Sequence, residues 1–282
     1  MVGVTAKDLS DEARGVASGR GRLAGRRVAI IGAGQVPCPG AGEVPIGNGR
    51  AISLLCAREG AALALCDIDE SAVQETAHLA QAEGARVGVS VGDATDPDDV
   101  SRFVSDAVTS LGALDGLALV VGGGRAGDLA TTSMQDWDWT FALNTRSQFL
   151  ALQAALPVLS PGSSVVLISS IAGYAPVHEM VAYHAAKAAL EGLKQVVARL
   201  AAERGIRVNI VAPGSIDTPT ARRATSPTYR AAAEAGHPEI PLRRTGTGWE
   251  VAYPTVFLLS GEASFITGHT LVVDGGFLAL RH

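Results

Sequence analysis

Tyr183 and Lys187 are the two side chains whose spacing most directly suggests chemistry. They stand four residues apart in VAYHAAKAALEGL, an apolar pattern of helical period, so both project from one face of a predicted helix. A free tyrosine has a pKa of about 10, too high for a base near neutral pH. A nearby ammonium favours the phenolate, and lowering the pKa by two to three units requires roughly 3–4 kcal/mol. The pair therefore predicts a tyrosine that gives and takes a proton.

A serine hydroxyl is expected in the same crevice. Ser170 follows the apolar run SSVVLISS and lies at the end of a predicted strand. A hydroxyl at that point can hold a substrate oxygen while the tyrosine exchanges its proton. Taken singly, a tyrosine four residues before a lysine is common by chance, and a helical tyrosine usually packs. The combination with a strand-terminal serine is what indicates a site.

The first predicted strand, RRVAIIG, leads into a glycine-rich segment that we interpret as a divided phosphate-binding turn. GAGQVPCP begins like GxGxxG, but its two prolines exclude a helix start, and the helical pattern begins only at GNGRAIS. We predict an insertion over residues 33–46. A glycine- and proline-rich surface loop explains the motif about as well. The residues predicted to approach the pyrophosphate are Gly32, Gly47, Asn48 and Gly49.

The second predicted strand ends in ALALCDIDE and places Asp67 at its carboxyl end. A carboxylate there can accept both ribose hydroxyls of an adenosine and would repel a 2′-phosphate, so we expect NAD rather than NADP. Asp93 ends the third strand and could meet the adenine, although a turn-forming aspartate is nearly as good an explanation. The residues predicted to bind the adenosine end are Asp67, Ile68, Asp93 and Ala94.

The elements that must position these residues alternate between short β-rich runs and longer helical ones. Such alternation predicts right-handed crossovers and a parallel sheet covered on both sides. The expected fold is α/β, a single Rossmann-type doubly wound parallel sheet of about seven strands with helices on both faces. We assign it to residues 25–282 and expect residues 1–24, which are polar and aperiodic, to form a mobile tail.

Composition excludes several classes of function. The chain of 282 residues is 47% hydrophobic with a net charge of −5, which suits a buried core but not a nucleic-acid partner, because phosphate contacts need a basic surface. Cys38, Cys56 and Cys66 lack metal spacing, so we expect no metal and reduced thiols in the cytoplasm. No apolar stretch approaches the roughly 18–20 residues that span a bilayer, so no membrane association is expected.

The sequence resembles the short-chain dehydrogenase/reductase family, in its compact single-domain branch, from about residue 23 to 277. ISSIAG (168–173) and YHAAK (183–187) look like the family's catalytic serine and its tyrosine–lysine pair, and their spacing selects Ser170 over Ser169. The resemblance implies that Lys187 also bonds the nicotinamide ribose. It further implies that Asn144, in WDWTFALNTRSQF, holds a proton-relay water beside the lysine.

RVNIVAPGSIDTP (207–219) is similar to the family segment in which a Pro-Gly turn passes the nicotinamide. The resemblance implies that Pro213 and Gly214 form this turn, that the Ile216 backbone meets the carboxamide, and that the Thr218 hydroxyl meets a phosphate. It also implies hydride transfer on the pro-S face.

Three departures from the family pattern stand near the cofactor region. Ile31 replaces the usual threonine before the first glycine, and the glycine motif carries the insertion, which brings Cys38 near the cofactor. The family's NNAG motif is replaced by LVVG (119–122), in which only Gly122 survives as a predicted cofactor contact. None of the three departures touches the proton-transferring group.

We therefore expect an NAD-dependent oxidoreductase that acts on a small-molecule secondary alcohol or ketone, with residues 217–245 as a substrate lid. Two alternatives stay open: an NADPH-type ketoreductase of acyl-carrier substrates, and a catalytically dormant NAD-sensing protein. His178, Met180 and His184 are expected at the pocket or its rim, with His178 as an extra base a less favoured alternative. The apolar outer positions of helices 135–157 and 180–204 predict a homo-oligomer, a tetramer or a dimer.

Overall fold

The computed structural model describes residues 9–38, 44–224, 237 and 239–280. Within them, seven parallel strands form one sheet in the order β3-β2-β1-β4-β5-β6-β9. The order reverses between β1 and β4, where a doubly wound sheet leaves a crevice beyond the carboxyl ends of its strands. The strands are β1 (Arg27–Ile31), β2 (Ala62–Asp67), β3 (Val87–Val91), β4 (Leu114–Leu119), β5 (Leu159–Ile168), β6 (Arg207–Pro213) and β9 (Thr270–Val273).

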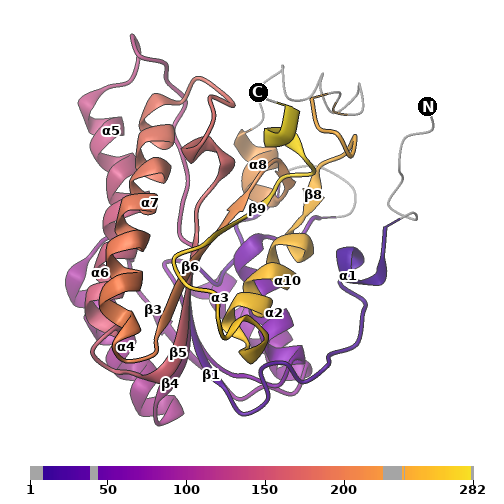
Figure 1. Ribbon diagram of the computed structural model, residues 1–282, viewed down its shortest axis with the longest axis vertical. Helices are drawn as coiled ribbons and strands as arrows, with labels where there is room; N and C mark the ends of the chain where they lie inside the picture. The colour runs from indigo at the N-terminus through magenta and orange to yellow at the C-terminus, as the bar shows by residue number, and fades with distance from the viewer. Residues whose placement is uncertain (1–8, 39–43, 225–236, 238, 281–282) are drawn as a thin grey trace.

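Helices cover both faces of the sheet, as Figure 1 shows, so the predicted Rossmann-type fold of about seven strands is confirmed. One face carries α2 (Asn48–Arg58), α3 (Glu70–Ala82) and α10 (Gly248–Leu259). The other carries α4 (Pro97–Leu111), α5 (Met134–Phe141), η2 (Ala142–Arg146), α6 (Ser147–Ala155) and α7 (Val181–Ala202). The central strands β1, β2, β4 and β6 are buried on both sides, so their sequences are mainly apolar, whereas the edge strands β3 and β9 are only partly buried.

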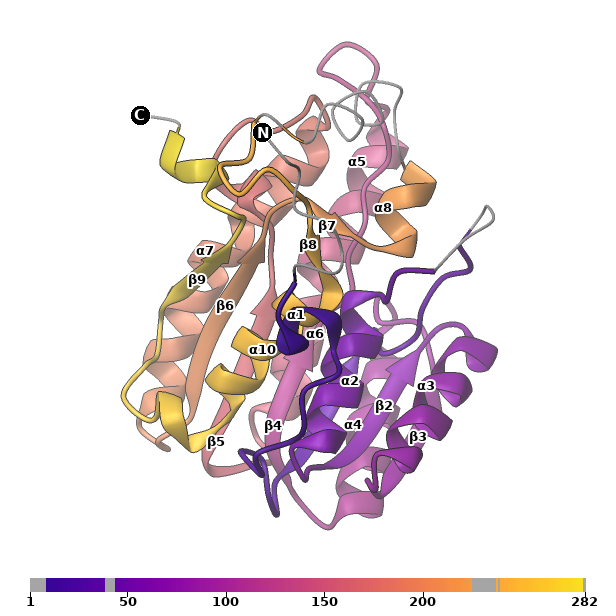
Figure 2. The same ribbon diagram turned by 90° about the vertical axis from the view of Figure 1, so that its right-hand side faces the viewer.

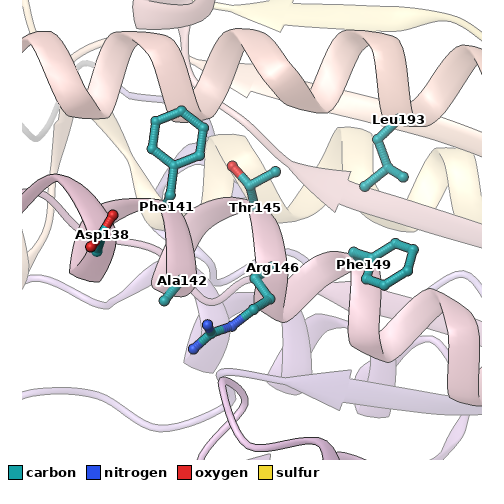
Figure 3. Close-up of a pocket in the computed structure, with 7 residues that line it drawn as sticks. All are labelled: Asp138, Phe141, Ala142, Thr145, Arg146, Phe149 and Leu193. Atoms are coloured by element: carbon teal, nitrogen blue, oxygen red, sulfur yellow. The ribbon is translucent and has the colours of Figure 1, made fainter.

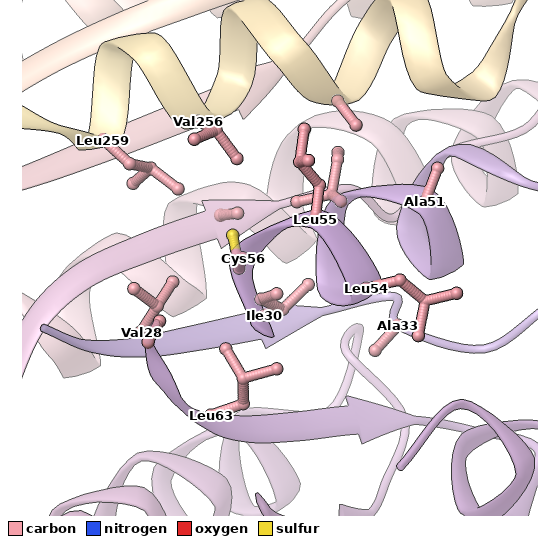
Figure 4. Packing of buried hydrophobic residues seen from close by; sticks show 14 of the residues in the cluster. Val28, Ile30, Ala33, Ala51, Leu54, Leu55, Cys56, Leu63, Val256 and Leu259 are labelled. Atoms are coloured by element: carbon pink, nitrogen blue, oxygen red, sulfur yellow. The ribbon is translucent and has the colours of Figure 1, made fainter. Parts of the chain in front are cut away.

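The core between the sheet and the first helical layer is built from aliphatic side chains. Val28 and Ile30 of β1 are fully buried, and they lie beneath Leu55 of α2 and Val256 and Leu259 of α10 (Figure 4). Burying one such side chain contributes about 1.5–3 kcal/mol. This packing holds the amino end of α2 against the end of β1.

Residues 9–24 are not the mobile tail that the sequence predicted. Ser10 caps the short helix α1 (Asp11–Arg14), which packs against α10. Leu23 is fully buried, and Arg22 forms an ion pair of 2.8 Å with the buried carboxylate of Glu59. The polar composition hid this docking because ion pairs, backbone hydrogen bonds and a single leucine anchor the segment. Residues 1–8 lie outside the described part of the chain.

Short elements gather above the carboxyl ends of the strands. They are η3 (Ile171–Gly173), β7 (Ile216–Asp217), α8 (Pro219–Ala224), β8 (Gly246–Thr247) and η5 (Phe277–Leu280). A further short helix, η4 (Gly261–Ala263), follows α10. β7 pairs with β8 in a second, two-stranded sheet, visible near α8 in Figure 2. This pairing joins the two ends of the predicted lid, whose residues 225–236 and 238 are outside the described ranges. None of the described helices is long and apolar enough to cross a membrane.

Candidate active site

Ser170 and Tyr183 meet at the carboxyl end of β5. Ser170 follows this strand and caps η3, accepting a hydrogen bond of 3.2 Å from the Ala172 N–H. Tyr183 lies in the first turn of α7, near enough to Ser170 for this hydroxyl to lower the pKa of the phenol. Ser169, the other candidate, instead donates to the Lys187 carbonyl at 3.2 Å. The structure therefore places Ser170, rather than Ser169, on the side of the tyrosine.

Lys187 lies one helical turn further along α7 and is buried. Its Nζ donates to the Ile168 carbonyl at 3.1 Å and lies 5.7 Å from the centre of the Tyr183 ring. Burial lowers the pKa of Lys187 to about 7, because removing water disfavours the ammonium. The amine is thus poised to change its charge close to neutral pH.

The pKa of Tyr183 differs from the sequence expectation. We expected the amine and the positive nicotinamide of a bound cofactor to lower it together. In the protein by itself, burial raises the pKa of Tyr183 above its usual value, and the nearby Ser170 hydroxyl lowers it only in part. The physical reason is that the same burial that removes water from the phenol also lowers the pKa of the Lys187 ammonium. The protein alone does not make this phenol acidic.

Asn144 lies on the π-helical turn η2, between α5 and α6, and its side chain is fully buried. The amide donates to the carbonyls of Gly123 at 2.6 Å and Thr140 at 2.8 Å, and its Oδ1 accepts from the Gly123 N–H at 3.1 Å. A Cβ on Gly122 would come within 2.8 Å of the Lys187 Nζ and 2.9 Å of the Asn144 Oδ1. The glycine therefore leaves the space in which the lysine and the asparagine lie together.

The end of β1 and the start of α2 approach one another very closely. Gly32 has φ +86°, and a Cβ on Gly49 would lie 1.9 Å from the Gly32 carbonyl oxygen. α2 begins at Asn48, beyond the proline-containing loop, as predicted. The buried Oδ1 of Asn48 has no hydrogen-bond partner among the described residues. A helix start whose first N–H groups have no intrahelical partner fits the pyrophosphate of a dinucleotide. The unpaired Asn48 Oδ1 is an acceptor and would meet a donor rather than a phosphate oxygen.

Asp67 lies at the carboxyl end of β2, where it accepts hydrogen bonds from the Gly34 N–H at 2.8 Å and the Asp69 N–H at 3.2 Å. Both contacts hold the carboxylate at the rim of the crevice and leave lone pairs for a ribose. Asp93 instead accepts from the Thr95 N–H and hydroxyl, each at 2.8 Å. The turn-forming explanation of Asp93 thus has direct support, and the adenine contact does not.

The remaining predicted cofactor residues line the same end of the sheet. Ile68 is exposed beyond β2, and Ala94 is half-buried beyond β3. Gly214 follows Pro213, the last residue of β6, and bonds the Val273 carbonyl at 2.9 Å. The backbone of Ile216 belongs to β7. The Thr218 hydroxyl accepts from the Ala221 N–H at 3.1 Å at the start of α8.

Comparison with known proteins agrees with this geometry. A solved short-chain dehydrogenase/reductase from Burkholderia xenovorans superposes with a TM-score of 0.82 at 35% identity, covering 92% of this chain and 98% of its own. A family model described as enoyl-(acyl carrier protein) reductase matches residues 45–278. The chain belongs to the short-chain dehydrogenase/reductase family.

Two relatives illustrate the range of this family. The oxidoreductase YghA of Escherichia coli is 33% identical over 261 residues, which cover 92% of this chain and 84% of YghA. The 2-(S)-hydroxypropyl-CoM dehydrogenase 3 of Xanthobacter autotrophicus is 32% identical over 266 residues, covering 92% of this chain and 99% of the relative. This short-chain dehydrogenase/reductase is therefore an oxidoreductase of a family that uses NAD or NADP.

Sequence reasoning missed two features of the site. The helix expected to run unbroken through WDWTFALNTRSQFLALQAAL contains the π-helical turn at Asn144, and π-turns often mark functional positions. His178 and His184 were placed singly at the rim, whereas their imidazoles contact one another, with 3.2 Å between His184 Nε2 and His178 Nδ1. The adjacency of histidines six residues apart depends on the loop before α7 and has no periodic signal.

Other charged candidates have structural partners. Arg222 pairs with Asp217 at 2.7 Å, and Arg244 pairs with Glu250 at 2.7 Å. The first pair connects α8 to the end of β7. The second connects the segment before β8 to the start of α10. Among the described residues, no cluster of three or more histidine, cysteine or acidic side chains could hold a metal ion.

A separate hollow lies on the outer surface, away from Tyr183. Figure 3 shows that Phe141 and Phe149, from α5 and α6, face it together with Leu193 of α7. Phe149 is 47% exposed, which is high for a phenylalanine. These are the outer helix faces through which the sequence predicted pairing of copies.

Proposed function

We propose that this chain transfers a hydride between NAD(H) and a secondary alcohol or ketone, with Tyr183 as the general acid and base. The observation that carries the proposal is that Lys187 Nζ lies 5.7 Å from the centre of the Tyr183 ring, with Ser170 beside the phenol and buried Asn144 next to the lysine. A dormant NAD-sensing protein would not need these four side chains at one place. Their arrangement therefore favours catalysis over sensing.

In the oxidative direction, the substrate hydroxyl binds between the Ser170 hydroxyl and the Tyr183 oxygen. A bound nicotinamide would supply the hydride acceptor and a positive charge that favours the phenolate. Tyr183 takes the hydroxyl proton, while Ser170 donates to the substrate oxygen and keeps it in place. Lys187 lies behind the tyrosine, where its amine can pass the proton to a water held by Asn144. Reduction reverses these steps.

Lys187 has a second role in the proposal because of its position. It is fixed by the Ile168 carbonyl and has two further N–H groups, which can bond the hydroxyls of a nicotinamide ribose. We also propose that Gly122, which follows β4, contacts the same half of the cofactor. The turn Pro213–Gly214 at the end of β6 would contact it as well. Ile216 and Thr218 would meet the carboxamide and a phosphate.

Asp67 favours NAD over NADP in this proposal. Its carboxylate stands at the end of β2 beside the Gly34 N–H, and its negative charge would repel a 2′-phosphate. Gly32, Gly47, Asn48 and Gly49 would hold the pyrophosphate. Ile68 and Ala94 would flank the adenine, and Asp93, already held by Thr95, would form the turn between them.

Steady-state assays with a panel of secondary alcohols test the proposal. Reduced cofactor should appear with NAD at a kcat/KM at least about tenfold above that with NADP. A preference for NADPH with acyl-carrier thioesters would favour the ketoreductase alternative. Tight NAD binding with no turnover of any alcohol or ketone would favour the sensor.

We also propose that copies of the chain associate through the outer faces of α5, α6 and α7. The exposed phenylalanine and the leucine facing the hollow would be covered in such a contact. Light scattering should then report a dimer or a tetramer. A monomer at all concentrations would contradict the proposed association and leave the active site unaffected.

A further inference from the structure

His178 and His184 form a hydrogen-bonded pair beside Tyr183 that the proposed proton transfer does not use. The His178 and Tyr183 ring centroids are 5.7 Å apart, and the two imidazole centroids are 4.5 Å apart. His184 lies on α7, and His178 lies in the loop that leads to it and is exposed. The pair therefore stands at the mouth of the site.

The hydrogen bonds of the pair can be counted. His184 Nδ1 lies 2.6 Å from the Ala172 carbonyl oxygen, so this nitrogen must carry a hydrogen. In a neutral His184 the Nε2 is then a lone pair, 3.2 Å from the His178 Nδ1. That Nδ1 already accepts from the Met180 N–H at 3.3 Å. With both rings neutral, His178 has two possible tautomers. If its hydrogen is on Nε2, the lone pairs of His178 Nδ1 and His184 Nε2 face each other. If its hydrogen is on Nδ1, that N–H faces the Met180 N–H.

One added proton removes this mismatch. When His184 carries hydrogens on both nitrogens, it donates to the Ala172 carbonyl and to His178 Nδ1. His178 stays neutral, accepts from both Met180 and His184, and holds its own hydrogen on the outer nitrogen, Nε2. The outer nitrogen is thereby a donor in the protonated pair. In the neutral pair in which His178 carries its hydrogen on Nδ1, the outer nitrogen Nε2 has a lone pair and repels an anion.

The surroundings agree with this distribution of charge. Although His178 reaches the surface, the protein packed around its ring, and then the charge of His184, lower the pKa of His178 to about 4. His184 lies in the first turn of α7, where the helix dipole opposes a cation. A bound anion would offset that cost.

The other titratable groups around the pair have partners of their own, lie at the surface or belong to the active site. On α7, Lys187 bonds the Ile168 carbonyl, and Glu191 is held by Lys194 and Thr270, the latter from β9. From the loop after η3, Tyr174 donates to Glu191. Glu179, next to His178, is exposed, and Tyr183 is the phenol of the site itself.

We propose that the His178–His184 pair is a subsite for a carboxylate on the substrate, which binds the outer nitrogen of His178 and takes up one proton into the pair. The inference rests on the proposed function, because it names the substrate class of that site: hydroxy acids and oxo acids. A charge-assisted hydrogen bond of this kind changes affinity by about ten- to hundredfold. Carboxylate binding should weaken as the pH rises and the pair loses its proton.

Equilibrium binding tests the subsite without turnover. Pentanoate and pentanamide, which differ in charge, are titrated into the enzyme with NADH by calorimetry at pH 8, in buffers of different ionisation enthalpy. We expect pentanoate to bind at least about tenfold more tightly than the amide and to take up a substantial fraction of one proton. His178→Gln and His184→Gln should abolish both effects, whereas His78→Gln, at an exposed position on α3, should change neither.

Equal affinity for the two compounds, no pentanoate binding, or uptake that survives both substitutions would overturn the subsite. Assays of 4-oxopentanoate and its methyl ester complete the design. Proton-linked pentanoate binding with no turnover of either compound, or of any alcohol, would leave the subsite standing and reject the proposed function. Equal turnover of 4-oxopentanoate and its methyl ester would support the proposed function and reject the subsite.

Discussion

Gly122→Ala tests whether the close contact among Gly122, Lys187 and Asn144 positions the catalytic amine. The new Cβ would lie 2.8 Å from the Lys187 Nζ and 2.9 Å from the Asn144 Oδ1, whereas ordinary contact begins at 3.4 Å. At least 0.6 Å (3.4 − 2.8) of displacement is therefore required. Lys187 must shift and weaken its bond to the Ile168 carbonyl, and Asn144 must shift against its hydrogen bonds to Gly123 and Thr140.

A displacement of this size at a catalytic group costs about 10- to 100-fold in rate, or roughly 1.4–2.7 kcal/mol of activation free energy. The assay is kcat and kcat/KM for the best alcohol found with NAD, together with NADH binding by fluorescence. Because Lys187 is also proposed to bond the ribose, NADH affinity should fall as well.

Gly123→Ala is the matched control. A Cβ there would meet only Leu143, at 3.4 Å, which is an ordinary contact. We expect this variant to retain the kcat of the native enzyme within about threefold, and both variants to unfold within a few degrees of it. Equal losses in the two variants, or full activity in Gly122→Ala, would refute the reasoning.

Three further outcomes are expected. Asp67→Ser removes the charge that opposes a 2′-phosphate, so the ratio of kcat/KM for NADP to that for NAD should rise at least about tenfold; an unchanged ratio would contradict the role of Asp67. Leu23→Ala should lower the free energy of unfolding, measured by urea denaturation, by about 2–5 kcal/mol, because Leu23 is fully buried. A loss near zero would indicate that residues 9–24 are mobile, as the sequence predicted. Lys187 has its pKa lowered from 10.5 to about 7, so between these values the unfolded chain binds more protons and stability should rise with pH. Lys187→Met should remove that rise, and a native enzyme whose stability falls across this window would contradict it.

The sheet and its covering helices were predictable because buried parallel strands are almost continuously apolar and alternate with helical periods. The start of α2 was predictable as well, because Pro37 and Pro39 would interrupt a helix that began directly after Gly34, while the apolar period resumes at Asn48. The placement of Ser170 at a strand end and of Tyr183 on the next helix followed from the same patterns. These features depend on local sequence.

The features that sequence reasoning missed depend on contacts between distant segments. The docking of residues 9–24 relies on Glu59, which accepts hydrogen bonds from the backbone of Arg20 and Arg22. The raised pKa of Tyr183 depends on how much protein surrounds the phenol. The His178–His184 contact depends on the path of an irregular loop. No periodicity in the chain encodes any of them.

The measurement that tests the central claim most directly is hydride transfer by Tyr183→Phe, followed as NADH formation under saturating alcohol and NAD. Removing one oxygen leaves the ring in place, so NADH binding should stay within about twofold of the native value while kcat falls by about 10²–10⁴-fold. A variant that binds NADH normally and turns over at the native rate would show that another group moves the proton.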